Sequence, residues 1–185
     1  MFSKTLDSAL VTRYSLLIYY KFIMKKKSDH IPGEIFHSEI KKVYNGPLHW
    51  AVNKKKKDMA HVVYEAVHEN RSYEDERRGR GRDYARWIFS EEERIREGVF
   101  SSCFELMIDA ELEPNASIGL HHHHKTEEIY YILKGSIRMT TVARNGEEHT
   151  EELKEGDAHA VLLGQAHYGT AGPKGVRFLA VAFRK

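Results

Sequence analysis

The sequence lacks the paired cysteines that crosslink small secreted proteins. Cys103 is the only cysteine among the 185 residues, so no disulfide bond can form within the chain. This composition fits a reducing compartment, and we expect a cytoplasmic protein. Cys103 stands in an apolar, strand-like stretch over residues 100–108, where we expect an inert thiol packed in the core.

The sequence also lacks a hydrophobic run that could cross a membrane. Residues 9–24 are apolar, but Arg13 and Lys21 interrupt them, and the stretch is too short for a span. It has no uninterrupted apolar centre and no small-residue cleavage site, and its basic run follows it, which argues against a secretory signal. Two interpretations stay open: residues 1–24 form an N-terminal helix, or the protein starts at Met24.

A large excess of charge of one sign is absent as well. The formal net charge is +2, which gives no support for nucleic acid or a membrane as a partner. Residues 77–82 read RRGRGR and could contact a phosphate or a carboxylate substrate. Three acidic residues directly precede this run, at 74–76, so we interpret the segment as an exposed loop whose charges are balanced.

Histidine, in contrast, is concentrated in one internal run at residues 121–124. If the run is an extended strand, alternate side chains share a face, so His121 and His123 point one way and the two others point the opposite way. Glu128 follows a short turn later. Two neutral imidazoles and a carboxylate suit a divalent first-row metal such as Fe, Mn, Ni, Zn or Cu.

A second histidine pattern lies downstream. Gly156-Asp157 forms a turn signal that leads into an apolar stretch, and a second glycine turn at Gly164 leads to His167. Together the two patterns resemble the two motifs of the cupin superfamily, in particular those of small single-domain metal-binding cupins.

The first cupin motif, G-x5-H-x-H-x(3,4)-E-x6-G, is matched by His121-x-His123-x4-Glu128-x6-Gly135. The second motif, G-x5-P-x-G-x2-H-x3-N, is degenerate here. Leu162 stands at its proline and Ala171 at its asparagine. Neither position is a metal ligand in the family, but without the proline we expect a less rigid turn before His167.

The resemblance implies that the metal ligands are His121, His123, Glu128 and His167. Two alternatives stay open: His122 with His124 in place of the first pair, and Glu127 in place of Glu128. Tyr130 shares strand parity with Glu128, which makes it a pocket residue and a catalytic hypothesis. We expect His159 to pack near the site or to support a ligand. The remaining histidines show no spacing signal, and we assign them ordinary surface or structural roles: His30, His37, His49, His61, His68 and His149.

Short apolar segments separated by glycine-centred turns predict an all-β protein. Strands are expected at residues 46–52, 59–67, 83–89, 104–112, 129–133, 137–143, 148–153, 160–163 and 176–183. Residues 90–98 predict a short capped turn or helix, and Asn145-Gly146 predicts a type I′ hairpin turn.

With the cupin resemblance, these signals predict three parts. Residues 99–185 form a cupin-type double-stranded β-helix, which is a jelly-roll barrel. Residues 25–98 form an N-terminal extension that adds strands to it, and residues 1–24 form the helix or alternative start described above.

Small cupins include dioxygenases, decarboxylases, lyases and isomerases, and the resemblance implies a metal-dependent enzyme that acts on a small polar metabolite, a sugar or an organic acid. The alternative is a non-catalytic cupin module that binds or senses a small molecule or a metal. The expected cofactor is a divalent transition metal: Fe, Mn, Ni or Zn. The expected partners are a small-molecule ligand and, because cupins often pair through their sheet edges, a second copy in a homodimer.

Overall fold

A computed structural model describes residues 34–38, 44, 48, 50–65 and 72–185 of the chain. The described part is built from nine antiparallel strands and two short 3₁₀ turns, Lys56–Asp58 and Glu76–Arg78. The strands are β1 Glu34–His37, β2 Ala60–Glu65, β3 Arg82–Ser90, β4 Phe104–Leu112, β5 Ser117–His122, β6 Thr126–Val142, β7 Glu148–Lys154, β8 Ala158–Val161 and β9 Ala166–Arg184. The predicted all-β class is confirmed, whereas the helix considered for residues 1–24 lies outside the described residues.

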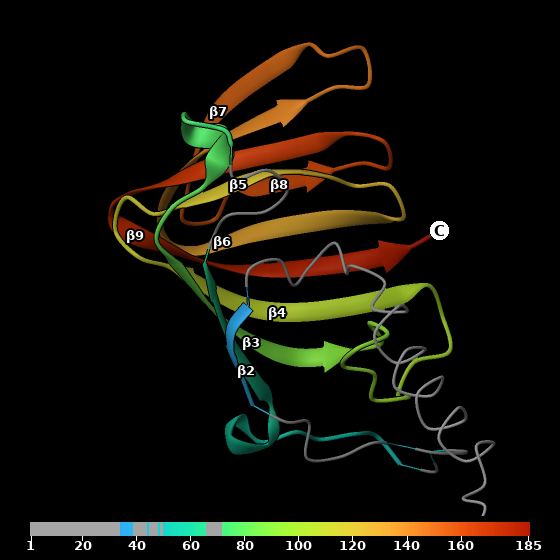
Figure 1. Cartoon of the computed structure of the whole chain (residues 1–185). Coiled ribbons are helices and arrows are strands. Elements are labelled where there is room, and N and C mark those ends of the chain that lie inside the picture. The colour runs from blue at the N-terminus through green and yellow to red at the C-terminus, as the bar shows by residue number, and fades with distance from the viewer. Residues whose placement is uncertain (1–33, 39–43, 45–47, 49, 66–71) are drawn as a thin grey trace, which may run out of the picture.

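The strands follow the order β1-β2-β3-β4-β9-β6-β7, with β5 paired to β9 and β8 paired to β6 (Figure 1). β6 and β9 are 17 and 19 residues long and pair with each other along most of their length. An isolated bridge between Arg80 and Ser117 joins the chain just before β3 to the start of β5. The two long strands therefore form the spine of the barrel, and β1 to β3 extend one sheet beyond β4. Strands were predicted at the positions of β2 and β3, whereas β1 was not predicted.

The chain passes from one part of β6 to the next through an irregularity at Gly135. The pairing with β9 shifts register between Gly135 and Ile137, and Gly135 has φ +79°. Residues 134–136, which were predicted as a turn between two strands, are instead part of one continuous strand. A glycine with positive φ serves a turn and a β-bulge equally well, so the sequence signal does not distinguish them.

The hairpin between β6 and β7 forms at the predicted place, but its turn is not type I′. Ala143 and Glu147 close a five-residue loop through the Ala143 N–H and the Glu147 carbonyl at 2.8 Å. Gly146 has φ +86°, whereas Asn145 is not among the residues with positive φ. A type I′ turn needs positive φ at both central residues, so the structure corrects the turn type.

Residues 91–98 form a tight loop without a helix, and a buried carboxylate holds it. Glu91 Oε1 accepts hydrogen bonds from the N–H groups of Val99 at 2.6 Å and Phe100 at 2.9 Å. Its Oε2 accepts from the N–H of Gly98 at 3.2 Å. The side-chain oxygen of Ser90 accepts from the N–H of Glu92, so the predicted cap is present although no helix follows it.

Two further sequence predictions fail within the described residues. Leu48 and residues 50–52 are not in a strand, and Trp50 is 87% exposed. Leu48, Trp50 and Ala51 are exposed, so the described part of this apolar run has no buried face that would favour a strand. Cys103 is exposed rather than buried, because it precedes β4 instead of lying within it.

Alternate side chains of the strands face the interior, as the period of a strand requires. The buried residues alternate along β2, β3 and β6: Val62 and Tyr64, then Asp83, Ala85 and Trp87, then Glu128, Tyr130 and Ile132. Within the described residues, no helix has the length and apolar character needed to cross a membrane.

Candidate metal centre

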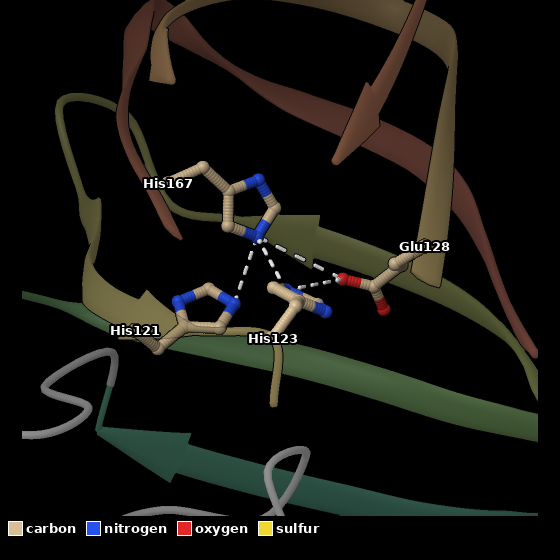
Figure 2. Close-up of side chains that lie close together, drawn as sticks. All are labelled: His121, His123, Glu128 and His167. Atoms are coloured by element: carbon tan, nitrogen blue, oxygen red, sulfur yellow. Dashed lines mark hydrogen bonds and ion pairs between the residues drawn. The ribbon is translucent and has the colours of Figure 1, made fainter. Parts of the chain in front are cut away.

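The four side chains predicted as metal ligands lie together inside the barrel (Figure 2). His121 is on β5 and is the direct pairing partner of His167 on β9. His123 follows the end of β5, and its N–H and C=O bond the turn at Gly164 and Gln165. Glu128 is on the first part of β6, where it pairs with β9 and β8. The cluster is thus fixed by backbone pairing among three strands.

The ligand atoms converge on one point. His167 Nε2 lies 2.8 Å from His121 Nε2 and 3.2 Å from His123 Nε2. Glu128 Oε2 lies 3.7 Å from His123 Nε2 and 3.8 Å from His167 Nε2. All four side chains are 4% exposed or less. Buried charged groups cost folding free energy unless they are paired or bind a metal. The convergence of these four buried side chains is therefore what a metal site would require.

The second nitrogen of each imidazole is held by a neighbour. His121 Nδ1 lies 2.9 Å from the carbonyl oxygen of Gly119, which can only accept, so Nδ1 carries the proton and Nε2 presents a lone pair to the cluster. His123 Nδ1 lies 3.3 Å from Thr126 Oγ1, and His167 Nδ1 lies 3.0 Å from His159 Nε2. Such outer contacts fix the orientation of metal-binding histidines.

The alternative ligands considered from the sequence face away from the cluster. His122 and His124 stack on each other with ring centroids 5.5 Å apart, and His124 is exposed. Glu127 is exposed and contacts the N–H of Leu163 at 3.4 Å. Strand alternation therefore separates the two sets, and the structure brings together only the preferred one.

Tyr130 lies beside the cluster, on the same face of β6 as Glu128. It is 5% exposed, its ring stacks on Phe178 at 4.5 Å, and the ring centroid of His167 is 5.3 Å away. Burial, followed by the charge of Glu128, raises the pKa of Tyr130 well above its usual value. The hydroxyl therefore stays protonated at neutral pH, and it hydrogen-bonds Glu128.

His159 on β8 contacts His167. From the sequence, His159 was expected either to pack near the site or to support a ligand. The two rings are stacked, with centroids 5.2 Å apart and planes 14° apart. Burial lowers the pKa of His159 to about 4, so it is neutral at pH 7. A neutral His159 can accept the Nδ1 proton of His167 at its Nε2, which leaves His167 Nε2 free to point its lone pair at the cluster.

The turn before His167 is held without the proline of the cupin motif. The N–H of Leu162, which a proline would lack, donates to the side-chain oxygen of Gln165 at 2.9 Å. The N–H of Gln165 donates back to the carbonyl of Leu162 at 2.9 Å. Gln165 thus supplies a local constraint where the motif is degenerate, and no feature of the motif itself indicated it.

Two buried polar residues of the extension strands were not singled out from the sequence. Asp83 on β3 pairs with Tyr64 on β2, and the Tyr64 hydroxyl hydrogen-bonds the Asp83 carboxyl. Burial raises the pKa of Asp83 to about 7, and the Tyr64 hydrogen bond partly offsets this. Their pairing depends on the β2–β3 register, for which no motif exists, so only the unusual acid at the start of a predicted strand could have drawn attention.

The donor set fits a divalent transition metal. Three imidazole nitrogens and one carboxylate oxygen lie within 4.8 Å of one another, all buried. Imidazole with carboxylate suits Fe, Mn, Ni and Zn, and four protein ligands leave one or two positions open on a five- or six-coordinate ion. The cluster could therefore hold a metal that also binds a ligand, although the donor set does not select the element.

Comparisons with known proteins agree with the fold. The family model described as Cupin matches residues 102–185. A crystal structure of a predicted oxalate decarboxylase from Thermotoga maritima is 24% identical, with 72% of this chain and all of that one covered and a TM-score of 0.53. No curated protein matches the chain.

Two further solved structures are similar over the barrel. A variant of oxalate decarboxylase from Bacillus subtilis is 30% identical over 55% of this chain, with a TM-score of 0.48, and the match spans 25% of that longer chain. The cupin domain of Cnp3 from Schizosaccharomyces pombe is 18% identical over 56% of this chain and 65% of its own, with a TM-score of 0.45.

The family match begins just before β4 and ends at the last residue, so it covers all the strands that carry the buried cluster. Both motif histidine sets and the strand pairing that unites them lie inside it. Residues 102–185 form a cupin domain.

Proposed function

We propose that the protein is a metal-dependent cupin enzyme that acts on a small polar metabolite, a sugar or an organic acid. The observation that supports this most directly is the convergence of His121, His123, Glu128 and His167 in the barrel interior. A structural metal site is usually closed, whereas a five- or six-coordinate ion held by four protein ligands keeps one or two positions open for a ligand.

The residues of the site would have two roles: some would hold the ion, and others would exclude water from it. The three histidines and Glu128 would hold the ion, whose contribution when bound is to polarise an oxygen of the ligand. Tyr130 keeps its proton and offers a hydroxyl beside Glu128. The apolar side chains of Ile132 and Phe178, each 1% exposed or less, exclude water from this side of the interior.

The names of similar structures do not identify the substrate of this protein. The Thermotoga protein is described as a predicted oxalate decarboxylase, but at 24% identity the likeness concerns the fold. Folds of this kind support many reactions, so the reaction has to be sought at the site itself. Dioxygenase, decarboxylase, lyase and isomerase reactions are all compatible with the ligand set.

The first experiment is metal content by elemental mass spectrometry on protein without a tag. Nickel columns must be avoided, because His122 and His124 form a surface pair that could bind nickel artefactually. We expect about one metal per chain, lost in His123→Ala and in His167→Ala. His124→Ala is the matched control, because it removes an imidazole from the same run but from the outer face, and it should keep its metal.

Turnover is then tested on the metal-loaded protein with a panel of sugars and organic acids. Product formation that is lost in His167→Ala supports the enzyme. Metal binding with ligand-dependent thermal stabilisation but no product would favour a binding module instead. Absence of metal after reconstitution with Fe, Mn, Ni and Zn would overturn the proposal.

A further inference from the structure

Two polar atoms on the interior face of β3 have no hydrogen-bond partner among the described residues. They are Oδ1 of Asp83 and Nε1 of Trp87. The two residues are 3% and 0% exposed, and they share one face of the strand with only the methyl group of Ala85 between them. Buried polar groups are almost always satisfied, so an acceptor and a donor left open on one face indicate a missing partner.

The topology places this face of β3 on the same barrel interior as the metal cluster. The bridge between Arg80 and Ser117 attaches the chain next to Asp83 to β5, the strand that carries His121. Tyr64, the pairing partner of Asp83, and Trp87 belong to the same buried cluster as Tyr130. The Tyr130 ring in turn lies 5.3 Å from the ring of His167. The interior face of β3 and the metal cluster thus border the same buried interior, which Tyr130 also lines.

The chemistry of the two atoms limits which chemical groups could be the missing partner. A hydroxyl group both donates and accepts, so it satisfies Asp83 whether the carboxyl is ionised or protonated, and it can also accept from the Trp87 N–H. A carboxylate only accepts, so it meets Trp87 well but is repelled by an ionised Asp83 and by Glu128. A ligand that presents a hydroxyl to β3 therefore fits better than one that presents a second carboxylate.

We propose that Asp83 and Trp87 form a second set of ligand contacts in the barrel interior, which selects a hydroxy acid or sugar acid over a dicarboxylate of the same length. The carboxylate of such a ligand would face the metal cluster and a hydroxyl would face Asp83. This deepens the proposed function and rests on it, because it concerns what the same site binds.

The test uses matched pairs of acids on the metal-loaded protein, with Kd measured by isothermal titration calorimetry. The pairs are glycolate and oxalate, glycerate and malonate, and gluconate and adipate. In the wild type, at least one hydroxy acid should bind more tightly than its dicarboxylate. In Asp83→Asn, that preference should fall by about tenfold, because the charge that repels the second carboxylate and strengthens the hydroxyl hydrogen bond is gone.

Two further variants make the outcome specific. Asp109→Asn removes a carboxylate from the outer face of the neighbouring strand, where it pairs with Arg177, and should leave the preference unchanged. Trp87→Phe keeps an aromatic ring but removes the N–H, and should raise the Kd of the hydroxy acid about fivefold.

The inference is overturned if the loaded wild type binds dicarboxylates at least as tightly, if it binds no acid of the panel, or if Asp83→Asn and Asp109→Asn shift the preference equally. Metal content is measured on every sample. A protein without metal contradicts the proposed function, whereas a loaded protein without the preference contradicts only the role of Asp83 and Trp87.

Discussion

The carboxyl group of Asp83 is buried on the interior face of β3, where an ionised group loses its hydration. Burial raises its pKa from 3.8 to about 7, and the Tyr64 hydrogen bond opposes this shift. The folded protein therefore holds the Asp83 proton more tightly than the unfolded chain does. Protonation favours folding here, so the contribution is fully present below about pH 4 and is lost as pH rises towards 7.

Asp83→Asn should remove this pH dependence, because an amide stays neutral. Between pH 5 and pH 8 the free energy of unfolding of the wild type should fall relative to the variant by roughly 2 to 3 kcal/mol. Urea unfolding at the two pH values measures this, with chelator present so that metal binding does not contribute. Wild-type and Asp83→Asn curves that stay parallel across this range, as expected for the Asp109→Asn control, would refute the assignment.

At the scale of residues, the sequence predicted the cluster but not its surroundings. His121, His123 and Glu128 could be found because their spacing is local and strand alternation decides which of them share a face. His167 could be found because a second motif surrounds it. Asp83 and Trp87 could not, because their role depends on which strands close over the interior, and strand pairing over long sequence distances leaves no local pattern.

At the scale of elements, β6 depends on one glycine. Gly135 has φ +79°, and an added Cβ would lie against the carbonyl oxygen of Gly175, too close for any real contact. Gly146 in the β6–β7 turn has a similar φ of +86°, but an added Cβ would meet nothing within 4 Å. The two positions therefore share the backbone strain and differ in the steric clash.

Gly135→Ala should cost about 3 kcal/mol or more of unfolding free energy, whereas Gly146→Ala should cost about 1 to 2 kcal/mol from strain alone. Chemical denaturation of both variants measures the difference. Equal losses would mean that β6 and β9 can separate at Gly135 without consequence, and would contradict the close approach of the two strands there.

The ranges of the strands were predicted correctly where both ends of a strand are marked by clear turn residues. β3, β4 and β7 match their predicted ranges to within a residue or two. β6 and β9 were each predicted too short. Residues 134–136 were read as a turn although the backbone of β6 continues through them, and no strand was predicted over residues 166–175 of β9. The same ambiguity explains the wrong turn type at Asn145, where Gly146 alone takes the left-handed conformation.

At the scale of the whole molecule, the cluster connects segments that are far apart in the sequence. His121 and His167 are paired across β5 and β9, and Glu128 reaches them from β6. An ion held by all three strands binds the folded state and has no comparable site in the unfolded chain, so binding adds directly to the stability of the barrel. Such an ion would stabilise in particular the long-range pairing of β6 with β9.

Removing the metal should therefore lower the Tm of the whole barrel in one transition. At a free metal concentration one hundred times Kd, binding contributes about 2.7 kcal/mol, which corresponds to a Tm shift of roughly 5 to 10 °C for a chain of this size. Calorimetry with and without chelator measures it, and the shift should be present in His124→Ala but absent in His123→Ala. A wild-type Tm that does not respond to chelator, or a response that His123→Ala retains in full, would mean that the ion binds elsewhere and that the buried cluster holds its geometry through the histidine contacts alone.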